Sequence, residues 1–259
     1  MPIGIFDSGV GGLTVMKEIV RLLPSENILY LGDTARVPYG TRSSETVIKY
    51  SLQNAEYLIG HGIKLLVVAC NTASSVALAD LSAKYDLPVI GVVEPGARAA
   101  AAISAGHVAV IGTRTTIESG SYERAIKKIN SSINVTGIAC PLFVPLIEEG
   151  WLDGPVVHLT VEKYLSQAIH DGIDTLVMGC THYPMIRDVI AELVPARLID
   201  SAIETAREVM HVLDAGDLRS KNTGSGRKRF FVTDALEKFA GVGEKFLEHK
   251  IEDISKIEL

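Results

Sequence analysis

Short apolar runs alternate with longer amphipathic stretches through most of the chain. The runs are almost continuously apolar, which is typical of strands buried on both faces of a parallel sheet. Stretches 43–61 and 161–171 instead repeat apolar residues at helical spacing. This alternation predicts an α/β fold with mostly parallel sheets flanked by helices. The predicted strands are 3–6, 28–31, 65–69, 89–93, 108–111, 135–139, 176–178, 197–199 and 230–232.

Part of this pattern occurs twice. Segment 64–72 (KLLVVACNT) matches segment 174–182 (DTLVMGCTH), so Cys180 follows Cys70 by 110 residues. Neighbouring runs repeat at similar offsets: 3–8 corresponds to 108–113, and 89–94 corresponds loosely to 197–200. A repeat of this length predicts two similar structural units, each presenting a cysteine at the end of an equivalent strand.

We interpret the repeat as two pseudo-symmetric α/β domains with an active site in the cleft between them. The first domain is predicted to comprise residues 1–96 plus 207–259, and the second residues 97–206. Stretch 203–213 is predicted to form a helix that returns the chain to the first domain, which the tail then completes.

Composition narrows the class of protein. A chain of 259 residues with 47% hydrophobic residues is long enough for two domains. The formal net charge of −6 argues against nucleic acid as the main partner, and we interpret the basic segment 219–229 as a solvated loop. The longest uncharged stretch, 65–79, is too short to span a membrane, and the N-terminus lacks a basic leader region. We therefore expect a cytoplasmic protein without a membrane segment.

Two of the three cysteines stand where chemistry is expected. Ligands of parallel sheets bind beyond the carboxyl ends of the strands, and Cys70 and Cys180 each end an apolar run there. Cys140 is assigned to the core. A helix beginning after each of the two cysteines would favour the thiolate and lower the thiol pKa. No C-x-x-C pair or disulfide framework is present.

Two symmetric thiols suit the inversion of a carbon centre, because inversion needs a base on one face of the carbon and an acid on the other. Three nearby groups are candidates for assisting the thiols: Asp7 at the end of the first strand, His182 beside Cys180, and Glu148 after an apolar run. Each also has a purely structural interpretation, as a helix cap, a satisfied buried histidine and a solvated helix charge.

A glycine-rich segment, 7–14, follows the first predicted strand. It matches neither the dinucleotide-binding nor the P-loop pattern. We interpret it as a turn whose amides and Ser8 hydroxyl bind a small carboxylate. Loops 38–41 and 112–116 are similar, and together with Asn71, Thr72 and Thr181 they provide neutral donors for a small, charged, polar substrate.

At this level of detail the sequence resembles the glutamate racemases of the cofactor-independent aspartate/glutamate racemase superfamily. The matching segments extend from the N-terminus to residue 184, whereas the tail is similar only around 230–234. They are GIFDSGVGGLTV at 4–15, YLGDTARVPYG at 30–40, VVACNTAS at 67–74, GTRTTIESGSY at 112–122, CPLFVPLIEEG at 140–150 and GCTHYP at 179–184.

The resemblance implies two-base racemisation of L- and D-glutamate without pyridoxal phosphate, another cofactor or a metal, supplying D-glutamate for peptidoglycan. It implies that Cys70 and Cys180 are the acid/base thiols, assisted by Asp7, Glu148 and His182. It also implies a homodimer of two-domain subunits. The implied substrate contacts are Asp7, Ser8, Pro38, Tyr39, Gly40, Asn71, Thr72, Thr113, Thr116, Thr181 and His182.

Four alternatives stay open at this point. The chain could racemise aspartate or another amino acid, or it could carry out thiol–disulfide exchange between Cys70 and Cys180, for which C-x-x-C is missing. A non-catalytic module could use the same cleft to bind a small molecule. A zinc site of Cys70, Cys180 and His182 would match no familiar ligand spacing.

Overall fold

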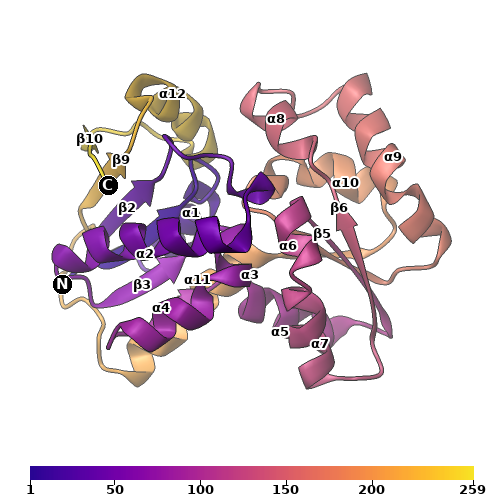
Figure 1. The fold of residues 1–259 in the computed structure, drawn as a ribbon, viewed down its shortest axis with the longest axis horizontal. Helices are drawn as coiled ribbons and strands as arrows, with labels where there is room; N and C mark the ends of the chain where they lie inside the picture. Colours follow the sequence, from indigo (N-terminus) through magenta and orange to yellow (C-terminus); the bar gives the residue numbers. More distant parts are fainter.

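The computed structural model describes residues 1–259 and contains two parallel sheets side by side, each flanked by helices (Figure 1). The first sheet has the order β10 (Ile254–Lys256), β9 (Lys228–Val232), β2 (Ile28–Gly32), β1 (Ile3–Asp7), β3 (Leu65–Val68) and β4 (Val89–Gly91). The second has the order β6 (Asn134–Ala139), β5 (His107–Gly112), β7 (Thr175–Gly179) and β8 (Arg197–Asp200).

The two sheets repeat one topology. Strands β2, β1, β3 and β4 stand in the same order as β6, β5, β7 and β8, and every paired strand is parallel. Ile5 pairs with Val67 in the first sheet as Val110 pairs with Val177 in the second. The predicted α/β fold with two mostly parallel sheets is therefore confirmed, and β3 and β7, which precede the two cysteines, are equivalent strands.

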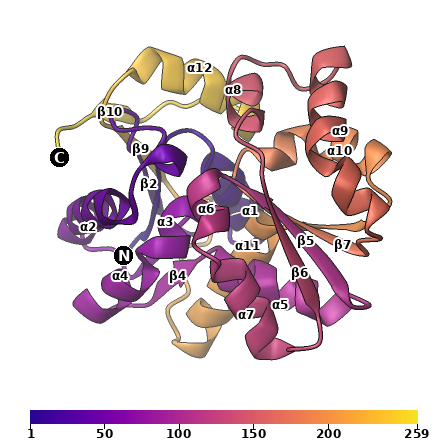
Figure 2. The same cartoon turned by 45° about the vertical axis from the view of Figure 1, so that its right-hand side comes forward.

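Twelve α-helices and two short 3₁₀ helices cover the sheets (Figures 1 and 2). Those that follow the strands of the first half of the chain are α1 (Leu13–Leu22), η1 (Tyr39–Thr41), α2 (Ser44–Gly60), α3 (Asn71–Val76), α4 (Leu78–Lys84) and α5 (Val93–Ile103). The remaining ones are α6 (Arg114–Glu118), α7 (Ser121–Ile129), α8 (Phe143–Glu148), α9 (Pro155–His170), η2 (Tyr183–Ile186), α10 (Arg187–Leu193), α11 (Ser201–Ala215) and α12 (Leu236–Leu247).

Local sequence explains where the two predicted helices begin. Helix α2 starts after Ser43, whose side chain accepts a hydrogen bond from the Thr46 amide at 3.3 Å. Helix α9 starts at Pro155, a residue that suits the first helical position because it lacks an amide proton. Stretches 43–61 and 161–171 thus correspond to α2 and α9, although α9 begins earlier than the apolar spacing indicated.

The chain returns from its second half to its first half near the position that the repeat predicts. Helix α11 contacts both α1 and α5, so the chain returns to the first half as expected for 203–213. Strands β9 and β10 then extend the first sheet. The domain bounds themselves, 1–96 plus 207–259 and 97–206, stay a prediction. Strand β4 ends at Gly91, before the predicted 93, because α5 already begins at Val93.

The hydrophobic core joins the two halves. One cluster of buried side chains includes Ile5 and Val67 of the first sheet together with Ile111 and Met178 of the second. Because this core is shared, the carboxyl ends of β1 and β3 have a fixed position relative to those of β5 and β7.

None of the helices combines the length and the apolar character needed to cross a bilayer.

Candidate active site

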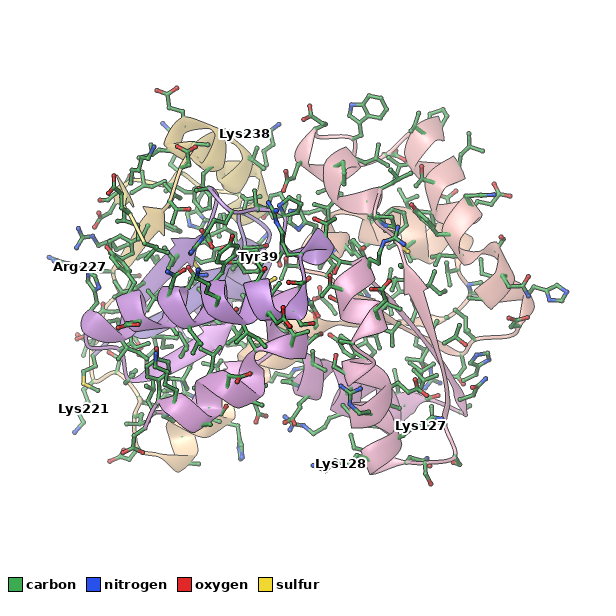
Figure 3. All side chains as sticks on the ribbon, viewed as in Figure 1. Tyr39, Lys127, Lys128, Lys221, Arg227 and Lys238 are labelled. Atoms are coloured by element: carbon green, nitrogen blue, oxygen red, sulfur yellow. The ribbon has the colours of Figure 1, made fainter.

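A cavity of about 380 Å³ lies where the carboxyl ends of the two sets of strands meet. Ser8 follows β1, Cys70 follows β3, Thr113 follows β5 and Cys180 follows β7. In Figure 3, Tyr39 lies near the junction of the two lobes. The cavity is lined by Ser8, Val37, Pro38, Tyr39, Gly40, Thr41, Cys70, Asn71, Thr72, Thr113, Arg114, Pro141, Val144, Pro145, Glu148, Glu149, Cys180, Thr181 and His182.

Nearly all site residues predicted from the sequence line this cavity; the exceptions are Asp7 and Thr116. Both exceptions are buried. The Thr116 hydroxyl lies 3.0 Å from that of Thr113 and 3.3 Å from that of Thr72, which do line the cavity. Thr116 therefore supports two lining residues from behind, and the direct ligand contact that the resemblance implies for it stays a prediction.

Seven lining residues were not singled out from the sequence, although Thr41 and Arg114 belong to the predicted donor loops 38–41 and 112–116. They are Val37, Thr41, Arg114, Pro141, Val144, Pro145 and Glu149. Four of them adjoin predicted residues in the sequence. Val144 and Pro145 precede Glu148 by four and three positions in α8. Helical spacing places all three on one face, so this signal could have found them.

Cys70 is the N-cap residue of α3. Its sulfur accepts a hydrogen bond from the Ala73 amide at 3.5 Å, and its thiol donates to the Ser8 hydroxyl at 3.7 Å. Burial nevertheless raises the pKa of Cys70 to about 12, and the charge of Asp7 raises it too. The expectation of a lowered pKa is wrong for this thiol because desolvation outweighs the start of a short helix.

Cys180 has different surroundings. Its sulfur lies 3.9 Å from Nδ1 of His182, and Nε2 of His182 lies 3.1 Å from Oε1 of Glu148. Burial opposes a charge on His182, but its hydrogen bonds with Cys180 and Glu148 outweigh burial and raise its pKa to about 10. The hydrogen bond to His182 lowers the pKa of Glu148. Phe246 of α12 packs edge-on against the imidazole, with ring centroids 5.7 Å apart.

Asp7 ends β1 and is completely buried. Its Oδ2 accepts the Gly9 amide at 2.9 Å, whereas Oδ1 has no partner. Burial raises the pKa of Asp7, against the opposing charge of His182 and the amides of Gly9 and Gly12. Asp7 thus lies close enough to Cys70 and to His182 for its charge to affect both. Its Oδ1 is free to bind a proton or to accept a hydrogen bond from a cationic group.

The glycine-rich turn after β1 holds the two halves together. A Cβ on Gly11 would lie 2.4 Å from both the His182 ring and the Thr181 hydroxyl. Thr14 donates to the carbonyl oxygen of Thr181 at 2.9 Å. Within this segment only Ser8 lines the cavity. The glycines therefore allow the turn that carries Cys180 to approach closely, and the interpretation of the segment as a carboxylate-binding turn stays a prediction.

Gly11→Ala is expected to lower kcat/KM for the reaction catalysed in this cavity by about 100-fold. The added methyl group would displace His182 from Cys180 and Glu148. Steady-state kinetics of the variant would measure the effect. Gly60→Ala is the matched control, since no heavy atom lies within 4 Å of the added Cβ. Equal kinetics for the two variants would contradict this role of Gly11.

A buried polar network fixes the loop that contains Tyr39. The Tyr39 hydroxyl donates to the carboxylate of Asp33 and accepts from Asn54 Nδ2 at 3.0 Å. Arg36 Nε donates to both oxygens of Asp33, at 2.7 and 2.8 Å. Asp33 is completely buried, so this cluster holds the loop from inside the first domain.

Threonines of the second half hold the same loop from the other side. The Thr115 hydroxyl donates to the carbonyl oxygen of Gly40 at 3.0 Å, and a Cβ on Gly40 would lie 2.6 Å from that of Thr113. The hydroxyls of Thr72 and Thr113 are 2.9 Å apart. The cavity wall is therefore assembled from both halves of the chain.

The sequence profile of Asp/Glu/hydantoin racemases matches residues 3–209, most of the chain. The chain belongs to this family. The glutamate racemase of Geobacter metallireducens is 54% identical over 99% of this chain and 96% of its own length. That of Neisseria gonorrhoeae is 45% identical over 100% of this chain and 97% of its own length.

Solved structures of similar proteins agree with the assignment of this chain to the racemase family. The crystal structure of the Francisella tularensis glutamate racemase in complex with D-glutamate superposes with a TM-score of 0.95 at 38% identity, covering 99% of this chain and 97% of the other. An aspartate racemase homologue from Pyrococcus horikoshii, 16% identical, shares the fold with a TM-score of 0.61, covering 82% of this chain and 99% of its own.

The His182–Glu148 pair predicts how the stability of this racemase depends on pH. The pKa of His182 is raised to about 10, so its charge stabilises the fold fully below the unfolded value of about 6.5 and is lost as the pH rises through about 10. The pKa of Glu148 is lowered, so its contribution is lost as the pH falls below about 4.5. We expect Glu148→Gln to lower the thermal unfolding midpoint most between about pH 4.5 and 6.5 and least near pH 10.

Thermal unfolding of the wild type and of Glu148→Gln at several pH values would measure this difference. A difference in midpoint that is the same at every pH would contradict a charged His182–Glu148 pair.

The basic segment 219–229 lies away from the cavity. Figure 3 shows Lys221 and Arg227 on the side of the first lobe opposite Tyr39, and Arg219 is paired with Asp214 at 2.6 Å. All three cysteines of the racemase are free, and no group of three or more His, Cys, Asp or Glu side chains is arranged to hold a metal ion.

Proposed function

We propose that this racemase interconverts L- and D-glutamate by a two-thiol mechanism. The observation that carries the proposal is that equivalent strand ends, one in each sheet, bring Cys70 and Cys180 to the same cavity. The glutamate specificity is supported by the names of the similar proteins at 54% and 45% identity and by the D-glutamate complex of the Francisella protein.

The chemical step removes a proton from one face of the substrate α-carbon and delivers a different proton to the other face. A thiolate on one face takes the α-proton, and the electron pair of the broken C–H bond stays on the carbon. The thiol on the other face then delivers its proton to that pair, which forms the new C–H bond and leaves a thiolate. Atoms and charge balance without a cofactor, and the roles of Cys70 and Cys180 exchange in the reverse direction.

The surroundings of the thiols suit this exchange. The raised pKa of Cys70 makes it a thiol in the ligand-free site, whereas Cys180 lies beside the imidazole of His182. The substrate brings an ammonium group, and an ammonium at the free oxygen of Asp7 would neutralise the charge that raises the Cys70 pKa. In this proposal Asp7 assists Cys70, and the His182–Glu148 pair assists Cys180.

The remaining lining groups are proposed to bind the two carboxylates. Hydroxyls, amides and backbone groups supply neutral donors around the cavity, and Arg114 adds one cation at its exposed rim. Hydrogen-bond donors hold a carboxylate in place and stabilise the negative charge that develops when the α-proton leaves. The proposed contacts are Ser8, Pro38, Tyr39, Gly40, Asn71, Thr72, Thr113, Thr181 and His182.

We further propose that the product D-glutamate is used for peptidoglycan synthesis, that the enzyme is cytoplasmic, and that it forms a homodimer. These proposals come from the resemblance to glutamate racemases over most of the chain. Sedimentation of the purified protein would test the dimer.

Solvent deuterium incorporation at Cα of L- and D-glutamate, followed by proton NMR without added cofactor, tests the function. Exchange accompanied by inversion is expected for both enantiomers. Exchange with aspartate but not glutamate would keep the mechanism and overturn the specificity; the fold shared with the Pyrococcus protein makes aspartate the first comparison. Absence of exchange with every amino acid tested would contradict the racemase mechanism and favour a binding module.

A further inference from the structure

A tyrosine hydroxyl reaches the cavity wall from behind. Tyr122 lies on α7 of the second half of the chain and is 3% exposed. Its hydroxyl donates to Oδ1 of Asn71 at 2.7 Å. Asn71 is the first residue of α3, in the first half, and it lines the cavity that Tyr122 does not reach. This hydrogen bond therefore joins the two halves of the chain behind a lining residue.

The tyrosine ring has a fixed position. A Cβ on Gly179 would lie 3.2 Å from Cε2 of the ring, and one on Gly96 would lie 3.3 Å from Cε1. The ring thus fills a space between the end of β7 and α5 that these glycines leave open. Burial raises the pKa of Tyr122, so the hydroxyl keeps its proton and can act as a donor.

The other end of the Asn71 amide is unpartnered. Asn71 is 1% exposed, and its Nδ2 has no hydrogen-bond partner. A buried donor without an acceptor costs free energy, so it indicates a group that a ligand satisfies. Because Oδ1 accepts from Tyr122, the NH₂ group is directed away from the tyrosine.

We propose that Tyr122 is a positioning residue that fixes the Asn71 amide with Nδ2 toward a carboxylate oxygen of the bound amino acid. The inference rests on the glutamate racemisation proposed above and adds a residue that does not touch the substrate. Without the tyrosine hydroxyl the amide can turn over, which presents Oδ1 to the carboxylate and replaces a hydrogen bond by repulsion. The carboxylate is present both before and during proton transfer, so the contact contributes mainly to substrate binding.

A double-mutant cycle tests the proposal with Tyr122→Phe, Asn71→Ala and the double variant. Tyr122→Phe is expected to raise KM for both enantiomers about tenfold while kcat changes less than about threefold. If Tyr122 acts through Asn71, the double variant has the KM of Asn71→Ala alone. Tyr85→Phe is the matched control, because Tyr85 donates to Leu52 in the first half, away from the cavity, and its loss should leave KM unchanged.

Independent effects of the two substitutions on KM, or an unchanged KM in Tyr122→Phe, would overturn the proposal. The side-chain amide signal of Asn71, assigned in ¹⁵N-labelled protein as the one that Asn71→Ala removes, gives a readout that needs no substrate. It is expected to shift in Tyr122→Phe, and an unmoved signal would also overturn the proposal. A wild type that does not racemise glutamate would instead refute the proposed function, while the amide signal still tests the role of Tyr122.

Discussion

Replacing either Cys70 or Cys180 by serine is expected to lower kcat for glutamate racemisation by about 10²- to 10⁴-fold. A serine hydroxyl is a far weaker acid than a thiol, so it neither delivers a proton nor forms the anion readily. The two-thiol scheme predicts a large loss for both variants, since each turnover uses one cysteine as base and the other as acid. Polarimetry of L- and D-glutamate and deuterium incorporation at Cα would measure the loss.

The third cysteine provides the control for this experiment. Cys140 is completely buried in the core and does not line the cavity. Cys140→Ala should retain kcat within about twofold if the variant folds, which thermal unfolding would establish. A serine variant at position 70 or 180 that racemises at the wild-type rate would exclude that cysteine as an acid or base.

The second large effect concerns stability. Lys64→Met is expected to lower the free energy of unfolding by about 3–5 kcal/mol, because it leaves a buried carboxylate without its cation. Lys64 Nζ lies 2.6 Å from Oε2 of Glu26, and the two side chains are 5% and 1% exposed. Glu26 Oε1 also accepts the Ser220 amide at 2.6 Å, so the pair connects the loop after α11 to the first sheet.

Urea unfolding followed by circular dichroism would measure this loss. The same substitution at a surface pair, Lys84→Met, is the control: Lys84 lies 3.8 Å from Glu56, with side chains 48% and 74% exposed. We expect a change of less than about 1 kcal/mol there. Pairing Lys64→Met with Glu26→Leu should recover part of the stability, since no charge is then left buried. A similar loss at both lysines would contradict the assignment.

The sequence predicted the fold well because most of the central strands, among them β1, β3 and β7, are buried on both faces. Nine apolar runs became nine strands, and the repeat around the two cysteines became a repeat of strand order. Strand β10 was missed because Ile-Ser-Lys at 254–256 has no apolar run. Only its pairing with β9 makes it a strand.

The sequence predicted those site residues that come directly after the ends of strands. What escaped prediction depends on contacts between distant segments. Gly11 looked like part of a ligand-binding turn, but its neighbours are Thr181 and His182, about 170 residues away in the chain. The pKa of Cys70 also depends on tertiary burial, which a helix start in the sequence does not reveal.

The unequal surroundings of the two thiols have a thermodynamic consequence. Cys70 lies with Ser8 and Asp7, whereas Cys180 lies with His182 and Glu148. Enantiomers have equal free energies in achiral water, so the equilibrium constant for their interconversion is one, and kcat/KM must be identical for the two directions. The asymmetry of the cavity can therefore change kcat and KM only together: the enantiomer with the lower KM must have a proportionally lower kcat. A substitution on one side of the cavity that changes kcat/KM in one direction must therefore change it in the other direction by the same factor.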